Sequence, residues 1–215
     1  MERRPVMNDT LMALIVTVYL ISFLFPSLLL PGALSWRDVT LGLGLVPAAL
    51  IAGERLYTLI TSMFLHASPL HLLGNLLYLY LLGGTLEHAL GSSRYLLLFL
   101  SSGIAASFVH SLSVLLFDPA ALTVPAIGAS GAASGVLGGY VYLLSKGRLP
   151  SPPHPAAIGM IALWFLYQFL LSLEATFGSS EIALWAHIGG LLAGVALSSL
   201  LIPAGSRQPQ PPPAL

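Results

Sequence analysis

The chain alternates long apolar runs with short polar breaks, and most of the runs have the length of a membrane-spanning helix. A helix needs about 20 apolar residues to cross a bilayer. Proline, glycine and charged residues separate six such runs, and the predicted spans are Thr10–Leu30, Ser68–Leu86, Tyr95–Phe117, Ala126–Ser145, a fifth from Pro155 to Leu173, and Ile182–Ile202. The predicted fold class is therefore all-α, a polytopic membrane protein that forms a six-transmembrane-helix bundle.

The region between the first two spans, residues 36–67, has a different pattern. Charged residues bracket an apolar, glycine-rich run at 39–53 that is too short to cross a bilayer. We expect this region to be an interfacial or re-entrant loop, partly inserted on the outer side between the first and second helices.

Composition supports one membrane domain and excludes several functions. Charged residues are 7% and hydrophobic residues 56% of the 215, whereas about 25% of a soluble domain is charged. We divide the chain into an N-terminal segment at 1–9, a six-span domain at 10–202 and a proline-rich tail at 203–215 that is expected to be disordered. Eight scattered basic residues and zero net charge exclude a nucleic-acid-binding surface, and the lack of cysteine excludes disulfides and thiolate chemistry.

The basic residues predict the orientation in the membrane. Six crossings place both termini on one side, and most of the basic residues then fall on that side: Arg3, Arg4, Arg94, Lys146, Arg148 and Arg207. Only Arg37 and Arg55 fall on the other side. Because positive residues favour the cytoplasmic face, we expect a cell-membrane protein with cytoplasmic termini.

Polar residues of three alternate spans are predicted to share one depth. Spans two, four and six begin at the outer side, which places His71, Asn75, Ser130 and His187 within about two turns of that face. Intramembrane polar groups usually face a bundle interior and find partners there. Each residue alone could form a simple interhelical hydrogen bond, but their shared depth favours a site that opens to the outer side.

Ser130 is the candidate nucleophile. Gly128 and Gly131 leave its hydroxyl unshielded, which suits attack on a substrate carbonyl. The same small residues also suit close helix packing, so both interpretations stay open for the glycines. Ser134 lies about 6 Å deeper along a helix, and we expect it to sit beside the histidine ring and bond a helical carbonyl one turn back.

His187 is the candidate general base for Ser130. No acidic residue is predicted at its depth, so we expect a dyad without a carboxylate. Gly190 and Gly194, one and two turns further on, predict close packing of this helix. His71 and Asn75 are four residues apart on one helix face and could both donate to an oxyanion.

No metal or cofactor is expected. His66 and His71 are five residues apart across a loop boundary, and the chain has no H-E-x-x-H pattern. We interpret His88, His110 and His154 as structural.

Three motifs occur in order on alternate spans: H-L-L-G-N at 71–75, G-A-S-G at 128–131 and A-H-I-G-G-L-L-A-G at 186–194. Together they resemble those of the rhomboid family of intramembrane serine proteases, over nearly the whole chain. The resemblance implies cleavage of single-span membrane proteins in or near their transmembrane segments. It also implies that Ser130 is the nucleophile and His187 the base, with His71 and Asn75 at the oxyanion site. The expected partners are transmembrane protein substrates and the lipid bilayer, and the sequence carries no signal for an oligomeric state.

The chain departs from the family at two places. Many members carry Trp-Arg in the outer loop where this chain has Tyr57-Thr58, and many have an aromatic residue at the position of Ser134. The alternative is a catalytically inactive rhomboid-like protein that binds membrane helices. Such a protein is expected to lack the serine at position 130 or the histidine at position 187. A transporter would need a polar path through the full bilayer, and the inner halves of the spans are apolar.

Overall fold

The computed structural model describes residues 5–176 and 182–202. Within these ranges the chain is helical, and its only β-type pairing is an isolated bridge between Leu45 and Ala126. The all-α prediction is therefore confirmed for the described residues. The predicted disordered tail, residues 203–215, lies outside them.

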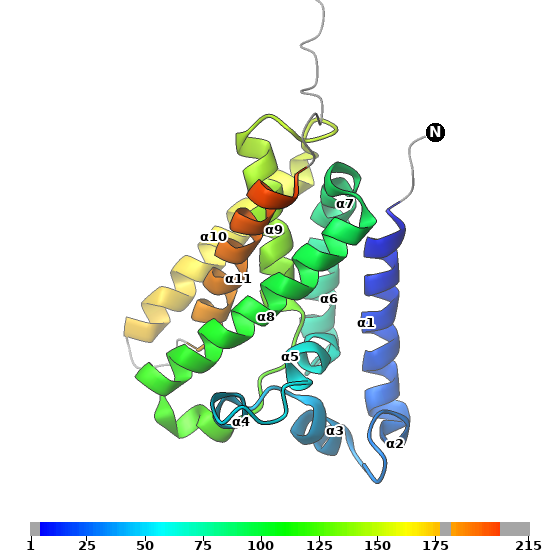
Figure 1. The fold of residues 1–215 in the computed structure, drawn as a ribbon, viewed down its shortest axis with the longest axis vertical. Helices are drawn as coiled ribbons and strands as arrows, with labels where there is room; N and C mark the ends of the chain where they lie inside the picture. The colour runs from blue at the N-terminus through cyan, green and yellow to red at the C-terminus, as the bar shows by residue number, and fades with distance from the viewer. Residues whose placement is uncertain (1–4, 177–181, 203–215) are drawn as a thin grey trace, which may run out of the picture.

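Long helices form the body of the molecule and run alternately between its two ends (Figure 1). They are α1 (Val6–Leu24), the continuous series of α6 (Pro69–Tyr78), the π-helix η2 (Leu79–Gly83) and α7 (Gly84–Leu90), then α8 (Ser92–Phe117), α9 (Ser130–Ser145), α10 (Pro155–Thr176) and α11 (Ile182–Leu201). In the described chain, α1, α8 and residues 184–201 of α11 are long and apolar enough to cross a membrane. The count of six crossings stays a prediction.

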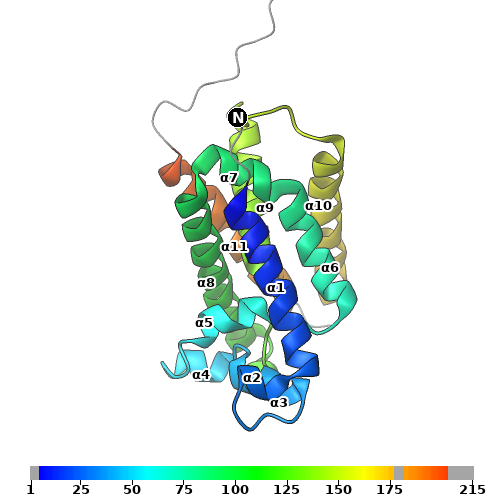
Figure 2. The ribbon, with the colours of Figure 1, turned by 90° about the vertical axis from the view of Figure 1, so that its right-hand side faces the viewer.

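Short helices gather at the end of the molecule opposite the start of α1 (Figures 1 and 2). They are α2 (Pro26–Leu29), α3 (Trp36–Leu43), α4 (Pro47–Ile51), α5 (Thr58–Thr61), and the 3-10 helices η1 (Ser62–Phe64) and η3 (Pro119–Thr123). The sequence had predicted that the first long helix ends at Leu30, but this helix ends at Leu24. Pro26 disfavours the helical conformation of the preceding residue, and Phe25 accordingly has φ −141° and ψ 56°.

The outer loop, residues 36–67, is anchored where α3 ends. The Arg55 guanidinium donates to the carbonyl oxygens of Leu41 and Gly42, and the Tyr57 hydroxyl donates to Gly42 at 3.0 Å. The Thr61 hydroxyl donates to the Leu43 carbonyl at 2.6 Å. The last carbonyls of a helix have no partner within it, so these side chains satisfy them and hold the loop together without the Trp-Arg pair.

Helix α9 lies in the middle of the bundle, with α1, α6, α8, α10 and α11 around it (Figure 2). Small residues allow its close contact with α11, since a Cβ on Gly190 would collide with the carbonyl of Gly131 and one on Gly194 with that of Gly135. On its other side, Gly131 packs against the Ala106 side chain of α8. Small residues commonly allow membrane helices to approach this closely.

The fourth helix starts later than predicted. Its first residue is Ser130, not Ala126, because Pro125 and a Gly128 with φ +127° keep the preceding segment out of helical geometry. The 16 residues of α9 span about 24 Å, less than the roughly 30 Å hydrocarbon layer. This length suits a helix whose first residue lies below the membrane surface.

Glu87 ties the start of α1 to the rest of the bundle. Glu87 lies beyond Leu86, the predicted end of the second span, but it belongs to α7 and is only 3% exposed. Its carboxylate accepts the backbone N–H groups of Met7 at 3.0 Å and Asn8 at 2.8 Å, and the Ser92 hydroxyl at 2.6 Å. These N–H groups belong to the first turn of α1, where a negative charge is favourable.

The Asn8 side chain completes this junction. Its amide nitrogen donates to the Leu79 carbonyl at 3.2 Å, and its oxygen accepts the Tyr95 hydroxyl at 2.6 Å. Leu79 begins the π-helix η2, where the ordinary helical hydrogen-bond pattern changes. Side-chain bonds from Asn8 thus join α1, η2 and α8.

We expect Glu87→Gln to lower the free energy of unfolding by about 2 kcal/mol, since it replaces a buried charged acceptor by an amide whose NH₂ faces N–H donors. Thermal unfolding of the purified protein in detergent measures the effect. Glu54→Gln is the matched control, because Glu54 is exposed. Equal Tm values for Glu87→Gln and the control would contradict the junction's role.

Candidate active site

The outer loop fixes the segment that leads into Ser130. Ala126 pairs with Leu45 through two backbone hydrogen bonds of 2.9 and 2.7 Å, and the Gly128 N–H donates to the Ser62 carbonyl at 2.9 Å. Ser130 follows at once as the first residue of α9. Its position is therefore set from both sides, by the loop before it and by the central helix after it.

His66 supports the same segment. Its side chain is fully buried, and its Nε2 accepts the Ala129 N–H at 3.4 Å. Its ring centroid lies 5.0 Å from that of His71. In the described part of the chain, no three His, Asp or Glu side chains group closely enough to hold a metal ion.

His71 and Ser130 lie on the same side of Gly128. A Cβ at position 128 would lie 2.8 Å from the His71 Nε2 and 3.8 Å from the Ser130 Oγ. The backbone there has φ +127°, which favours glycine independently of space. Gly128 thus lies against the His71 ring, which belongs to helix α6.

Asn75 lies one turn beyond His71 on α6 and is 5% exposed. Its Nδ2 donates to the His71 carbonyl at 2.9 Å. A side-chain amide carries two N–H donors, so one remains for another acceptor. Ser68 caps the N-terminus of α6, because its hydroxyl accepts the His71 N–H at 3.2 Å.

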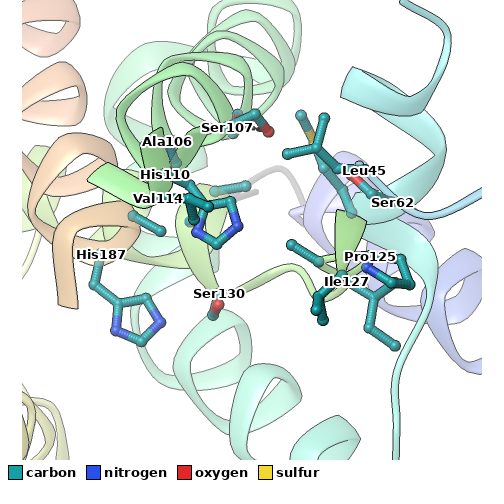
Figure 3. A pocket seen from close by; sticks show the side chains of 18 of the residues that line it. Leu45, Ser62, Ala106, Ser107, His110, Val114, Pro125, Ile127, Ser130 and His187 are labelled. Carbon is teal, nitrogen blue, oxygen red and sulfur yellow. Dashed lines mark hydrogen bonds between the residues drawn. The ribbon is translucent and has the colours of Figure 1, made fainter. Parts of the chain in front are cut away.

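Ser130 and His187 border one cavity of about 340 Å³ (Figure 3). Ser130 comes from the start of α9, and His187, 9% exposed, from the first turns of α11. No hydrogen bond joins these two described side chains. Catalytic hydrogen bonds are often long before substrate binds, and the volume falls within the range of small ligand sites.

The cavity wall combines small and apolar residues with a few polar groups. Figure 3 shows His110 of α8 between Ser130, His187 and Ser107. The sequence had assigned His110 a structural role only, although its depth in span three was a usable signal. Besides these, the wall includes Ser62, Met63, Ala106, Val114 and Ile127.

The N-terminus of α9 provides a second chemical feature. The first N–H groups of a helix have no partner within it, and the helix dipole makes this end electropositive. The N–H groups at Ser130 and Gly131 occupy such positions. A developing negative charge beside Ser130 would therefore be stabilised by backbone donors.

Two side chains of α10 contact this region. Trp164 Nε1 donates to the Ser134 hydroxyl at 3.3 Å, so Ser134 has a partner on another helix instead of the predicted carbonyl one turn back. Gln168 was not among the residues predicted for the site, and its Nε2 lies 3.2 Å from the His187 Nδ1. A lone amide in an apolar run was the only signal that could have identified it.

Comparison with known proteins agrees with this architecture. The Rhomboid domain family model matches residues 53–204. A candidate rhomboid protease of Bacillus subtilis, YdcA, is 31% identical over 195 residues, which cover 90% of this chain and 89% of that protein. The B. subtilis rhomboid protease GluP is 29% identical over 170 residues, or 79% of this chain and 31% of the relative. Rhomboid protein 1, mitochondrial, of Saccharomyces cerevisiae is 32% identical over 158 residues, which cover 71% of this chain and 44% of that protein. The chain is a multi-pass membrane protein and belongs to the rhomboid family.

Proposed function

We propose that this protein is an intramembrane serine endopeptidase that cleaves single-span membrane proteins in or near their transmembrane segments. The observation that carries the proposal is one cavity bordered by both Ser130 and His187, at the free end of a central membrane helix. The names of the relatives GluP and YdcA, as protease and candidate protease, support it.

In this mechanism, Ser130 Oγ attacks the scissile carbonyl while His187 Nε2 takes the hydroxyl proton. The C–N bond then breaks, and the proton passes from His187 to the leaving amine. Water next attacks the acyl-serine, gives a proton to His187 and releases the carboxyl product. The proton returns to Ser130, and neither a metal nor a cofactor enters the cycle.

The oxyanion of both tetrahedral intermediates is assigned to the region between Ser130, His71 and Asn75. The first N–H groups of α9 have no partner within the helix, and the His71 ring lies beside Gly128, two residues before Ser130. The second N–H of the Asn75 amide is the remaining donor. Donors held in place before the reaction cost no reorganisation when charge develops.

The proposed location is the cell membrane, with cytoplasmic termini and the active site open to the outer side. The cavity is bordered by Ser62 of η1 and Ala121 of η3, and the short helices lie at the end of the molecule away from the start of α1 (Figure 1). Transmembrane protein substrates and lipid are the proposed partners. A recessed Ser130 would meet a substrate helix within the bilayer while water enters from the nearby outer face.

The nucleophile is tested by a pair of serine variants. Ser130→Ala and His187→Ala are each expected to reduce cleavage of a model single-span substrate to background while the protein stays folded. Ser134→Ala should keep most of the activity, because Ser134 bonds Trp164 and lies deeper in the bundle. If the Ser130→Ala variant stayed active and the Ser134→Ala variant were inactive, the nucleophile would be Ser134 and not Ser130. Wild-type protein no more active than Ser130→Ala would favour the inactive, helix-binding alternative.

The backbone before the nucleophile is tested by Gly128→Ala. The added Cβ meets the His71 ring in a conformation that costs an L-residue about 1–3 kcal/mol, so we expect kcat/KM to fall by at least about tenfold. Gly159→Ala is the matched control, because a Cβ there would meet nothing within 4 Å. Equal activity of the two variants would show that the Gly128 geometry does not matter for catalysis.

The oxyanion assignment is tested by Asn75→Ala. We expect kcat to fall by about a hundredfold with a smaller change in KM, as for loss of a donor used mainly in the transition state. Thermal unfolding separates this effect from loss of the hydrogen bond to the His71 carbonyl. A change in KM alone would mean that Asn75 only positions substrate.

A further inference from the structure

Gln168 is a buried amide on an otherwise lipid-facing stretch of α10. Its side chain is 7% exposed, whereas Phe165, Leu166 and Tyr167 are 49%, 53% and 47% exposed. An amide without partners costs several kcal/mol in lipid. The inward position of Gln168 therefore requires a hydrogen-bond partner, and the structure provides one.

That partner is the His187 ring. The Nδ1 of His187 lies 3.2 Å from the amide nitrogen of Gln168 and 3.3 Å from its amide oxygen. The two side chains come from different helices, and the described residues of α10 otherwise pack only lightly against α11. One turn earlier on the same face of α10, Trp164 makes the bond to Ser134.

The chemistry of imidazole decides which amide atom matters. A neutral ring has one donor nitrogen and one acceptor nitrogen. If the amide oxygen accepts a hydrogen bond from Nδ1–H, then Nε2 keeps the lone pair that a general base needs. If the amide nitrogen donated to Nδ1, the proton would sit on Nε2, and the ring could not accept the Ser130 proton.

We propose that Gln168 is a positioning residue: its amide oxygen accepts Nδ1–H of His187, fixes the ring orientation and holds the tautomer with a free Nε2. This inference rests on the proposed Ser130–His187 dyad. Gln168 touches neither substrate nor the reacting atoms. It gives the dyad a neutral third member, and an amide avoids the cost of placing a carboxylate within the membrane.

The surroundings of the ring leave this role to Gln168. Among the residues that the structure describes, the other titratable groups around His187 are His71 from α6, His110 from α8 and Tyr167, whose ring centroid lies 6.3 Å away. None of these three is a carboxylate. Ser130, on α9, faces the cavity side of the ring.

The test compares Gln168→Leu, Gln168→Glu and Trp164→Phe in the cleavage assay. Gln168→Leu should lower kcat by about 10- to 100-fold at similar KM, less than the whole effect of a general base. Trp164→Phe is the matched control, because it removes the other hydrogen bond from α10, and its kcat should stay near the wild-type value. Gln168→Glu should keep more activity than Gln168→Leu. In Gln168→Glu, the acidic limb of the plot of kcat against pH should move to higher pH, because a carboxylate beside Nδ1 favours the protonated ring.

Wild-type kcat in Gln168→Leu, or an unshifted profile in Gln168→Glu, would overturn the proposal. If both variants fail to fold, the wild-type protein decides by ¹⁵N spectroscopy of its histidine rings, with the His187 signal assigned by its loss in His187→Ala. A proton on Nδ1 of the neutral ring is expected, and a proton on Nε2 would refute the role. If wild type cleaves no better than Ser130→Ala, the proposed dyad fails, and the ring spectrum still tests Gln168 separately.

Discussion

Exclusion of water is the constraint on which this structure depends. A polar group within a membrane helix bundle must find its partner in the protein, since lipid provides none. The Glu87 carboxylate meets this requirement at the first turn of α1, and the Ser134 hydroxyl meets it at Trp164. Each such bond fixes one helix relative to another. The His187 ring is held by the same kind of contact, its bond to Gln168 of α10.

The proposed active site combines this constraint with a helix that starts late. Gly128 cannot continue a helix at φ +127°, so α9 begins at Ser130 with its free N–H groups beside the hydroxyl. Backbone bonds to Leu45 and Ser62 hold the extended segment in place. The outer loop therefore acts on the site through these backbone bonds and through the His66 ring, whose Nε2 accepts the Ala129 N–H.

Close helix packing serves the site as well as stability. Gly190 and Gly194 bring α11 against α9, and this contact sets where His187 stands relative to Ser130. Helix α10 packs more lightly, yet it supplies the hydrogen-bond partner of the His187 Nδ1. The ring is thus positioned by a tight backbone contact on one side and by a single side-chain bond on the other.

The sequence predicted the helical membrane class, the rhomboid family and the residues around the proposed site, because charge depletion and glycine-flanked motifs are local signals. It failed where the answer depended on three-dimensional context. The start of α9 depended on the conformation of Gly128, and the helical state of Glu87 on its bonds to α1. His66, His110 and Gln168 lie outside the three motifs, and only the packed structure shows what each contacts.

The central claim is that Ser130 is a nucleophile activated by His187 within the bundle. Covalent labelling with a fluorophosphonate, followed by peptide mapping, tests this claim most directly because it identifies the reacting oxygen. A single label is expected on Ser130 in the wild-type protein, and none is expected in His187→Ala. A label on Ser134, or undiminished labelling of Ser130→Ala, would contradict it.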